Sequence, residues 1–168
     1  MPITAQTKVL GVDIGSRGAI GILTAEGGLL DAIDVPCLND GPAGRRAVNG
    51  PVLAEIIAKS HATKAYVELV NPRPGEGAVG AFAFGRSLGV AVGVLAALSI
   101  PVTLIAPAAW KRTVGIPPGK DGAKDAARSE ALRRWPHKAA WFARVKDHGR
   151  AEAALIGLAG LIKERAAR

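Results

Sequence analysis

The sequence is poor in cysteine, aromatic residues and acidic side chains. Its 168 residues include one cysteine, one methionine and 4% aromatic residues. The single cysteine, Cys37, excludes an internal disulfide framework and fits a reducing cytosol, so we expect a cytoplasmic protein. No neighbouring feature indicates a catalytic thiol, and we interpret Cys37 as a small structural residue.

The sequence also lacks a convincing membrane span and a secretion signal. The best candidate, residues 88–100, is interrupted by Gly89 and Gly93 and is too short to cross a bilayer. The amino terminus carries one lysine and then enters an apolar strand, which is not the pattern of a signal peptide. We therefore expect no membrane partner.

Basic residues are in excess. Lysine and arginine number 22 against 14 acidic residues, which gives a net charge of +8. Such a charge indicates a polyanionic partner, with nucleic acid the first expectation and an anionic membrane surface the second. Nearly half of the residues (49%) are apolar, and neither a repeat nor a domain boundary is visible. We expect one α/β domain over residues 1–168.

The apolar pattern predicts a mixed five-stranded sheet covered by helices. The first three strands (within residues 8–23, then 29–35) form an antiparallel meander with glycine turns. Two further strands are expected at 64–70 and 101–105. Helices are expected from Pro51 and over 79–98, 107–113, 123–135 and 150–166, and residues 38–49 are expected to be a loop.

Asp13 is the most informative residue of the chain. It interrupts the apolar strand at residues 8–14, where a carboxylate is costly to bury unless it is paired or binds a cation. The turn that follows, Gly15-Ser-Arg-Gly18, lets the backbone approach a ligand closely. The sequence therefore predicts that Asp13 faces a cation or a phosphate group.

Further acids lie at comparable positions. Glu68 interrupts the strand at 64–70, and Glu152 shares a helix face with Leu155 and Ile156, which should lie against the sheet. Taken singly, each acid has an ordinary structural interpretation, such as a solvated strand end or a first-turn helix acid. Together they predict a site for Mg²⁺, with Mn²⁺ as a substitute, because carboxylates without clustered cysteine or histidine favour these ions.

The fourth ligand is open between two residues. Asp147 lies five residues before Glu152 and reaches the site only if it precedes the helix. His148 lies four residues before Glu152 on the same face, and is a candidate ligand or a group that orients the attacking water. We place Asp147 slightly ahead. Two ions about 4 Å apart would suit in-line attack of water on a phosphodiester.

Short motifs follow one another in order along nearly the whole chain: GVDIGSRGAIG (11–21), VE (67–68), PGEG (74–77) with FGRSLG (84–89), PAAWK (107–111), KDAAR (124–128) and DHGRAEAALI (147–156). This ordered set resembles the RuvC-type Holliday junction resolvases of the RNase H-like superfamily, and more closely their phage-type members.

The resemblance implies an RNase H-like nuclease domain that acts as a homodimer on four-way DNA junctions. It implies paired nicks that leave 5′-phosphate and 3′-hydroxyl ends, and a bacterial or phage-encoded protein. Asp13, Glu68, Asp147 and Glu152 map to the four metal-binding acids. The apolar helix at 79–98 is the expected dimer interface.

The sequence departs from the classical pattern at two places. Classical members have two acids three residues apart, and here the position three before Glu152 is Gly149. They also carry an aromatic residue soon after the Glu68 equivalent, whereas this chain has none before Phe82. Junction opening must therefore differ, or the substrate range must include other branched DNA.

Basic residues surround the predicted site. They follow the ends of strands that should lie on the Asp13 side, where a DNA phosphate would pass. The candidate DNA-binding residues are Arg73, Arg86, Lys111, Arg112, Lys120 and Lys124. Lys111, Lys120 and Lys124 are also candidates to offset negative charge in the transition state, of which we favour Lys111 and Lys124 as catalytic residues.

Two other function classes remain open. The chain could be a branched-DNA-binding protein that kept the fold and lost the chemistry, although the retained acids argue against this. The Asp-Ile-Gly-Ser turn also occurs in nucleotide-binding phosphotransferases. Those enzymes need a duplicated domain and a second phosphate loop, for which the chain has no room, so we expect no nucleotide cofactor.

Overall fold

The computed structural model describes residues 7–15, 17–41, 45–69, 71, 75, 77–117 and 123–168, without the side chains of residues 123 and 124. A five-stranded sheet forms the centre, in the order β3-β2-β1-β6-β7. The strands are β1 (Lys8–Asp13), β2 (Ala19–Thr24), β3 (Leu29–Asp34), β6 (Ala62–Glu68) and β7 (Val102–Ile105). β1, β2 and β3 pair antiparallel, whereas β6 and β7 run parallel to β1. The predicted meander and mixed sheet are confirmed.

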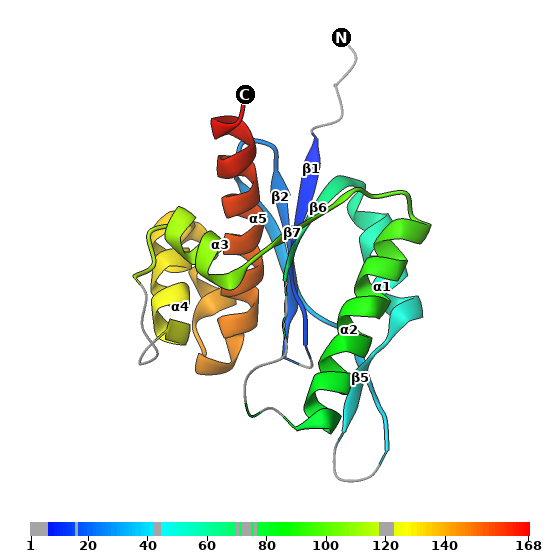
Figure 1. Cartoon of the computed structure of the whole chain (residues 1–168). Coiled ribbons are helices and arrows are strands. Elements are labelled where there is room, and N and C mark those ends of the chain that lie inside the picture. Colours follow the sequence, from blue (N-terminus) through cyan, green and yellow to red (C-terminus); the bar gives the residue numbers. More distant parts are fainter. Residues whose placement is uncertain are drawn as a thin grey trace.

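Helices cover both faces of this sheet (Figure 1). α3 (Pro107–Thr113), α4 (Ala123–Arg134) and α5 (His148–Ala166) lie on one face, and α1 (Gly50–Ser60) and α2 (Ala78–Ala97) lie on the other. Side chains alternate between the two faces along β1, so the strand contributes to a separate hydrophobic cluster on each face. Val9 belongs to the hydrophobic cluster under α5, and Leu10 and Val12 belong to the cluster under α1 and α2.

Glycines let α5 lie unusually close to the sheet. A methyl group built on Gly11 of β1 would lie 2.0 Å from the carbonyl oxygen of Ala153 and 2.4 Å from the backbone nitrogen of Gly157. One built on Gly21 of β2 would lie 2.9 Å from the backbone of Ala154. The backbone of α5 therefore rests almost directly on the backbones of β1 and β2.

The expected loop at residues 38–49 is wrong in part. It contains most of a small antiparallel hairpin, β4 (Cys37–Asn39) and β5 (Arg46–Val48), separate from the main sheet. Three-residue strands are too short to show alternation in the sequence. The hairpin leads into α1, whose first turn is capped by Asn49, since its side chain accepts from the backbone nitrogen of Val52.

The segment before α5 also differs from the prediction. It contains two 3₁₀ helices, η1 (Pro136–Phe142) and η2 (Val145–Asp147), and α5 begins at His148 rather than at Arg150. Asp147 therefore precedes the helix, which is the condition under which its side chain could approach the site.

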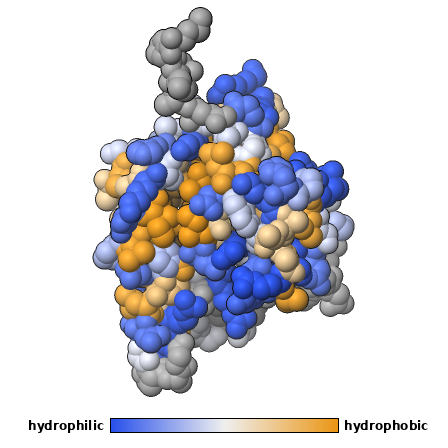
Figure 2. Space-filling model, turned by 180° about the vertical axis from the view of Figure 1, so that it is seen from behind, coloured by the Kyte–Doolittle hydropathy of each residue, from blue (hydrophilic) through white to orange (hydrophobic). Residues whose placement is uncertain are grey.

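The helix α2 is largely uncovered. Of its 20 residues only Ala91 and Leu95 are buried, and Phe82 is 72% exposed. By length and composition α2 is apolar enough to cross a membrane, which corrects the expectation drawn from residues 88–100. The helix extends farther toward the amino terminus than residues 88–100, and it includes Arg86 as its single charged residue. A single helix of this kind is weak evidence for a membrane. Figure 2, which shows the molecule from behind, has hydrophobic patches mixed with hydrophilic surface.

Candidate functional site

Asp13 and Glu68 occupy equivalent positions at the carboxyl ends of neighbouring parallel strands. Val12 of β1 is paired with Val67 of β6, and each acid is the next residue along its strand. Alternation places both side chains on the face covered by α5, since Val12 and Val67 belong to the cluster on the other face. Asp13 is 9% exposed and Glu68 is half-buried. The structure thus brings together the two strand acids predicted from the sequence.

Glu152 approaches this edge from α5. The helix runs antiparallel to β1 and β6, because its early residue Gly149 contacts Arg17, beyond the end of β1, while Gly160 lies against Tyr66 within β6. Glu152 lies on the row of α5 that includes Gly160, two turns nearer the start of the helix. It is half-buried on the side where β1 and β6 end.

These acids have the chemistry of a Mg²⁺ or Mn²⁺ site, although they are not drawn together around an ion. Within the described ranges, no three His, Cys, Asp or Glu side chains lie close enough to hold a metal ion as they stand. The long side chain of Glu152 can turn toward Asp13 and Glu68 without movement of α5. The donor set, hard oxygens with one neighbouring imidazole, fits these ions.

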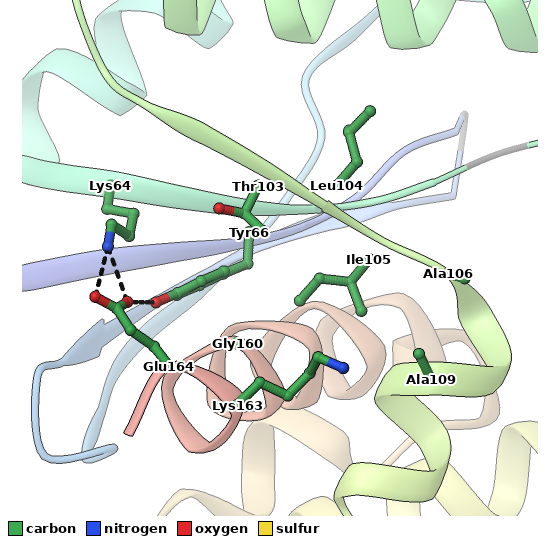
Figure 3. Close-up of a pocket in the computed structure, with 10 residues that line it drawn as sticks. All are labelled: Lys64, Tyr66, Thr103, Leu104, Ile105, Ala106, Ala109, Gly160, Lys163 and Glu164. Atoms are coloured by element: carbon green, nitrogen blue, oxygen red, sulfur yellow. Dashed lines mark hydrogen bonds and ion pairs between the residues drawn. The ribbon is translucent and has the colours of Figure 1, made fainter. Parts of the chain in front are cut away.

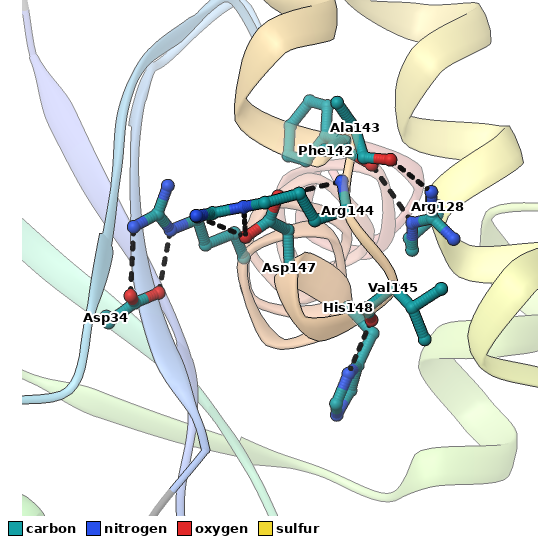
Figure 4. Close-up of polar contacts among 9 residues, drawn as sticks. Asp34, Arg128, Phe142, Ala143, Arg144, Val145, Asp147 and His148 are labelled. Atoms are coloured by element: carbon teal, nitrogen blue, oxygen red, sulfur yellow. Dashed lines mark hydrogen bonds and ion pairs between the residues drawn. The ribbon is translucent and has the colours of Figure 1, made fainter.

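Asp147 is held by its own 3₁₀ helix. Its carboxylate accepts hydrogen bonds from the Arg144 backbone nitrogen (2.9 Å), Nε (3.1 Å) and Nη2 (2.8 Å). Only 2% of the residue is exposed, and the Arg144 guanidinium holds the pKa of Asp147 below its ordinary value. Figure 4 shows the Asp147 carboxylate facing Arg144. The charge of Arg150, which is bound to Asp34, lowers the pKa of Asp147 further. Metal binding by Asp147 would have to displace Arg144.

His148 is the more available donor. Its Nδ1 lies 3.2 Å from the carbonyl oxygen of Val145. A carbonyl only accepts, so Nδ1 donates in this bond, which leaves Nε2 as the ring nitrogen that a metal ion could take. Figure 4 shows the ring directed away from the Asp147 carboxylate. His148 also shares the row of Glu152 on α5, and these placements favour it over Asp147 as the fourth ligand.

The structure explains the glycine that departs from the classical pattern. A methyl group built on Gly149 would lie 2.3 Å from the carbonyl oxygen of Arg17. No side chain fits there without moving α5 away from the turn that follows β1. An acid three residues before Glu152 is therefore excluded sterically, and a ligand from this turn must come from His148 or Asp147.

The predicted basic residues divide into three groups. Lys111 and Arg112 lie on α3, which follows the carboxyl end of β7, and Lys111 Nζ lies 5.3 Å from the centre of the Trp110 ring. Arg86 of α2 instead forms an ion pair with Asp40. Arg73, Lys120 and the side chain of Lys124 lie outside the described residues.

Sequence reasoning missed a basic pocket of about 480 Å³ beside His148. Arg17, Arg46 and Lys146 line it, together with Asp34 and the Asp147–His148 turn. These cations come from the turn after β1, from β5 and from η2, so only the fold brings them together. The positive charge of these three residues was the one signal in the sequence that could have indicated this pocket. The pocket has the size and sign to accept a backbone phosphate.

A second pocket, of about 450 Å³, lies on the same face between β6, β7 and α5 (Figure 3). At one end Glu164 accepts hydrogen bonds from Lys64 Nζ (2.8 Å) and Tyr66 Oη (2.5 Å). These bonds lower the pKa of Glu164 to about 2, while burial raises the pKa of Tyr66. Lys64 and Glu164 lie at the ends of their elements opposite to Glu68 and His148. The hydrogen bonds in this pocket form a structural network, and the pocket lies away from the predicted site.

Comparisons with known proteins show the fold. No protein-family model matches the sequence, and no curated protein matches it. The structure is similar to Thermus thermophilus RuvC in complex with a Holliday junction substrate, with a TM-score of 0.71 and 19% identity over 95% of this chain and 96% of that one. It is also similar to another Thermus thermophilus RuvC structure, with a TM-score of 0.55 and 15% identity over 96% and 97% of the two chains. The predicted α/β fold of the RNase H-like, RuvC type is confirmed.

Proposed function

We propose that this protein is a metal-dependent endonuclease that resolves four-way DNA junctions by paired nicks, leaving 5′-phosphate and 3′-hydroxyl ends. The observation that carries the proposal is the placement of Asp13 and Glu68 on adjacent strands beneath the helix that presents Glu152 and His148. That arrangement occurs in a fold similar to a RuvC bound to a Holliday junction.

The chemistry follows from the residues at this edge. Asp13, Glu68, Glu152 and His148 are the groups that would hold Mg²⁺ or Mn²⁺, two ions in our proposal. When bound, such ions polarise the phosphate and lower the pKa of water. Lys111 lies on α3 beside the same edge, where its ammonium would offset negative charge that builds on the phosphate oxygens in the transition state.

The basic pocket supports passage of DNA along the same edge. Arg17, Arg46 and Lys146 surround a hollow next to His148, so a phosphate held there would lie beside the predicted metal ligands. Contacts of this kind position DNA without reading its sequence. Lys111 and Arg112 extend the cationic surface on the other side of the acids.

A homodimer accounts for the exposed α2. Paired nicks require two sites on one junction, and the apolar surface around Val79 (64% exposed) and Phe82 (72% exposed) is expensive to leave in water. A second copy of the chain would cover this surface and supply the second site.

Cleavage of labelled DNA tests the proposal. Four-way, forked and linear substrates are incubated with Mg²⁺, Mn²⁺ or EDTA, and the nicks are mapped. We expect symmetric nicks in the four-way junction that require the metal, and a loss of at least about a hundredfold in rate for Asp13→Asn, because a ligand of the metal that stabilises the transition state is removed. Glu55→Gln on α1, far from the site, is the matched control.

Each alternative has a distinct outcome. Equal cutting of forks and flaps would make the enzyme a general branched-DNA nuclease. Tight junction binding without cleavage in either metal would indicate a non-catalytic binding protein. Unchanged cleavage by Asp13→Asn would contradict the proposed site.

The choice between His148 and Asp147 has its own test. We expect His148→Ala to lose at least about tenfold in rate at limiting Mg²⁺, since a ligand or a water-orienting group is removed. Asp147→Asn should lose stability while it keeps most of its activity at saturating Mg²⁺, because its carboxylate serves Arg144. The reverse pattern would restore Asp147 as the fourth ligand.

A further inference from the structure

Trp110 joins the hydrophobic core to one of the predicted metal ligands through a polar contact. The side chain is fully buried beneath α5, and its indole Nε1 donates a hydrogen bond of 2.8 Å to Glu68 Oε1. A buried indole N–H needs an acceptor. The other strongly buried tryptophan, Trp135, uses the backbone carbonyl of Gly27 for this purpose. Trp110 instead donates to a carboxylate predicted to bind metal.

The contact fixes the direction of the Glu68 side chain. Its backbone is held by β6, and one of its oxygens is now held by a rigid ring on α3, so the rotatable bonds between them have little freedom. A carboxylate has about four acceptor positions, and the indole takes one of them. The remaining positions are available to a metal ion, and an outer partner of this kind orients a ligand before the ion arrives.

The face of the same ring lies near a second functional candidate. Lys111 Nζ lies 5.3 Å from the centre of the Trp110 ring, within the range of a cation–π contact. One buried side chain thus links an acid and a cation on two different elements. Of the three lysine candidates, Lys111 is the one whose described side chain connects to Glu68.

We propose that Trp110 is a positioning residue that orients the Glu68 carboxylate for metal binding and steadies Lys111 beside it. The inference rests on the proposed function, because it takes Glu68 to be a metal ligand. Trp110 itself need touch neither DNA nor ion, and its effect passes through the two residues that it contacts.

The test compares Trp110→Phe with Trp141→Phe, a half-buried tryptophan whose ring contacts Lys138. Mn²⁺ binding is measured by calorimetry without DNA. We expect Trp110→Phe to weaken Mn²⁺ binding by about ten- to hundredfold, the usual effect of losing an outer partner of a ligand. In cleavage assays the half-saturating Mg²⁺ concentration should rise, and the rate at saturating Mg²⁺ should change much less. Trp141→Phe should leave both quantities unchanged.

A second substitution separates the hydrogen bond from packing. Benzothienylalanine at position 110 keeps the shape of the ring but replaces the N–H with sulfur, and it should reproduce the loss of Mn²⁺ affinity in a protein with native circular dichroism. In a Glu68→Gln background, replacing Trp110 should add no further loss.

The outcomes distinguish this inference from the function on which it rests. Normal Mn²⁺ affinity in the benzothienylalanine protein, with an active wild type, would overturn the role of Trp110 alone. A wild type that neither binds Mn²⁺ nor cuts any DNA would overturn both.

Discussion

Gly11 decides how closely α5 can approach β1. Since a methyl group there would lie 2.0 Å from a backbone oxygen of α5, no rotation of a side chain can relieve the clash. We expect Gly11→Ala to lower the free energy of unfolding by about 3 kcal/mol or more. Urea unfolding measures it. Gly77→Ala is the control, because that residue has φ −67° and no atom within 4 Å of a built Cβ. Equal midpoints for the two variants would contradict the close contact.

Glu164 gives the stability of the protein an acid dependence. Lys64 and Tyr66 lower its pKa from 4.5 to about 2 in the folded state. A depressed folded pKa stabilises the protein above the unfolded pKa, and this contribution is lost as the pH falls from about 4.5 toward 2.

The corresponding variant is Glu164→Gln, whose melting temperature should fall less steeply than that of the wild type across this pH window. Glu55→Gln should not differ from the wild type, because the Glu55–Lys59 pair is exposed and solvent screens it. Parallel Glu164→Gln and wild-type curves would exclude the network as a source of acid sensitivity.

At the scale of single residues, the sequence predicted where Asp13 and Glu68 lie better than it predicted which residues the acids contact. Asp13 and Glu68 could be predicted because a charge within an apolar strand has few purely structural explanations. Arg144 could not be predicted as the partner of Asp147, because the contact depends on a 3₁₀ turn that has no periodic pattern. The bond from Trp110 to Glu68 joins residues 42 apart and depends on how α3 leaves β7.

Among the elements, α2 is an apolar helix that the rest of the described structure leaves mostly exposed. Phe82 and Val79 project from its exposed side, so a charge there need not disturb the fold. We expect Phe82→Asp to shift the protein from dimer to monomer at micromolar concentration, as measured by sedimentation velocity. The matched control is Val145→Asp in η2, where the wild-type residue is also 72% exposed. A monomeric wild type would refute the dimer.

Elements with a clear apolar period or a marked boundary were predictable, and elements without these signals were not. β1, β2, β6 and α3 lie close to the predicted ranges, because alternation, glycine turns and Pro107 mark them clearly. The β4–β5 hairpin, η1 and η2 each have too few residues for a period to emerge. The exposure of most of α2 could not be predicted either. An apolar helix has the same kind of sequence whether it packs against its own sheet or against another chain.

For the whole molecule, charge sets how binding depends on salt. Each phosphate neutralised by Lys or Arg contributes about −0.9 to the slope of log K against log salt concentration for duplex DNA. With Arg17, Arg46, Lys111, Arg112 and Lys146 at phosphates, we expect a slope of about −4 to −5. Fluorescence anisotropy with a labelled four-way junction and Ca²⁺ measures it.

Replacing Arg17 with Ala should reduce the magnitude of that slope by about one. Lys59→Ala, on the exposed face of α1, should leave it unchanged. If Arg17→Ala kept the full slope, the basic pocket beside His148 would not be part of the DNA path.

The direct backbone contact of α5 with β1 and β2 has a consequence for how such a protein can evolve. Where two elements meet through bulky side chains, each exchange in the core alters their spacing and any chemistry that bridges them. Here the spacing is set by main-chain atoms meeting at Gly11 and Gly157, so apolar residues elsewhere can be exchanged while Glu152 keeps its place over the strands. Because backbone contacts set this spacing, two chains that are 19% identical in sequence can retain one fold.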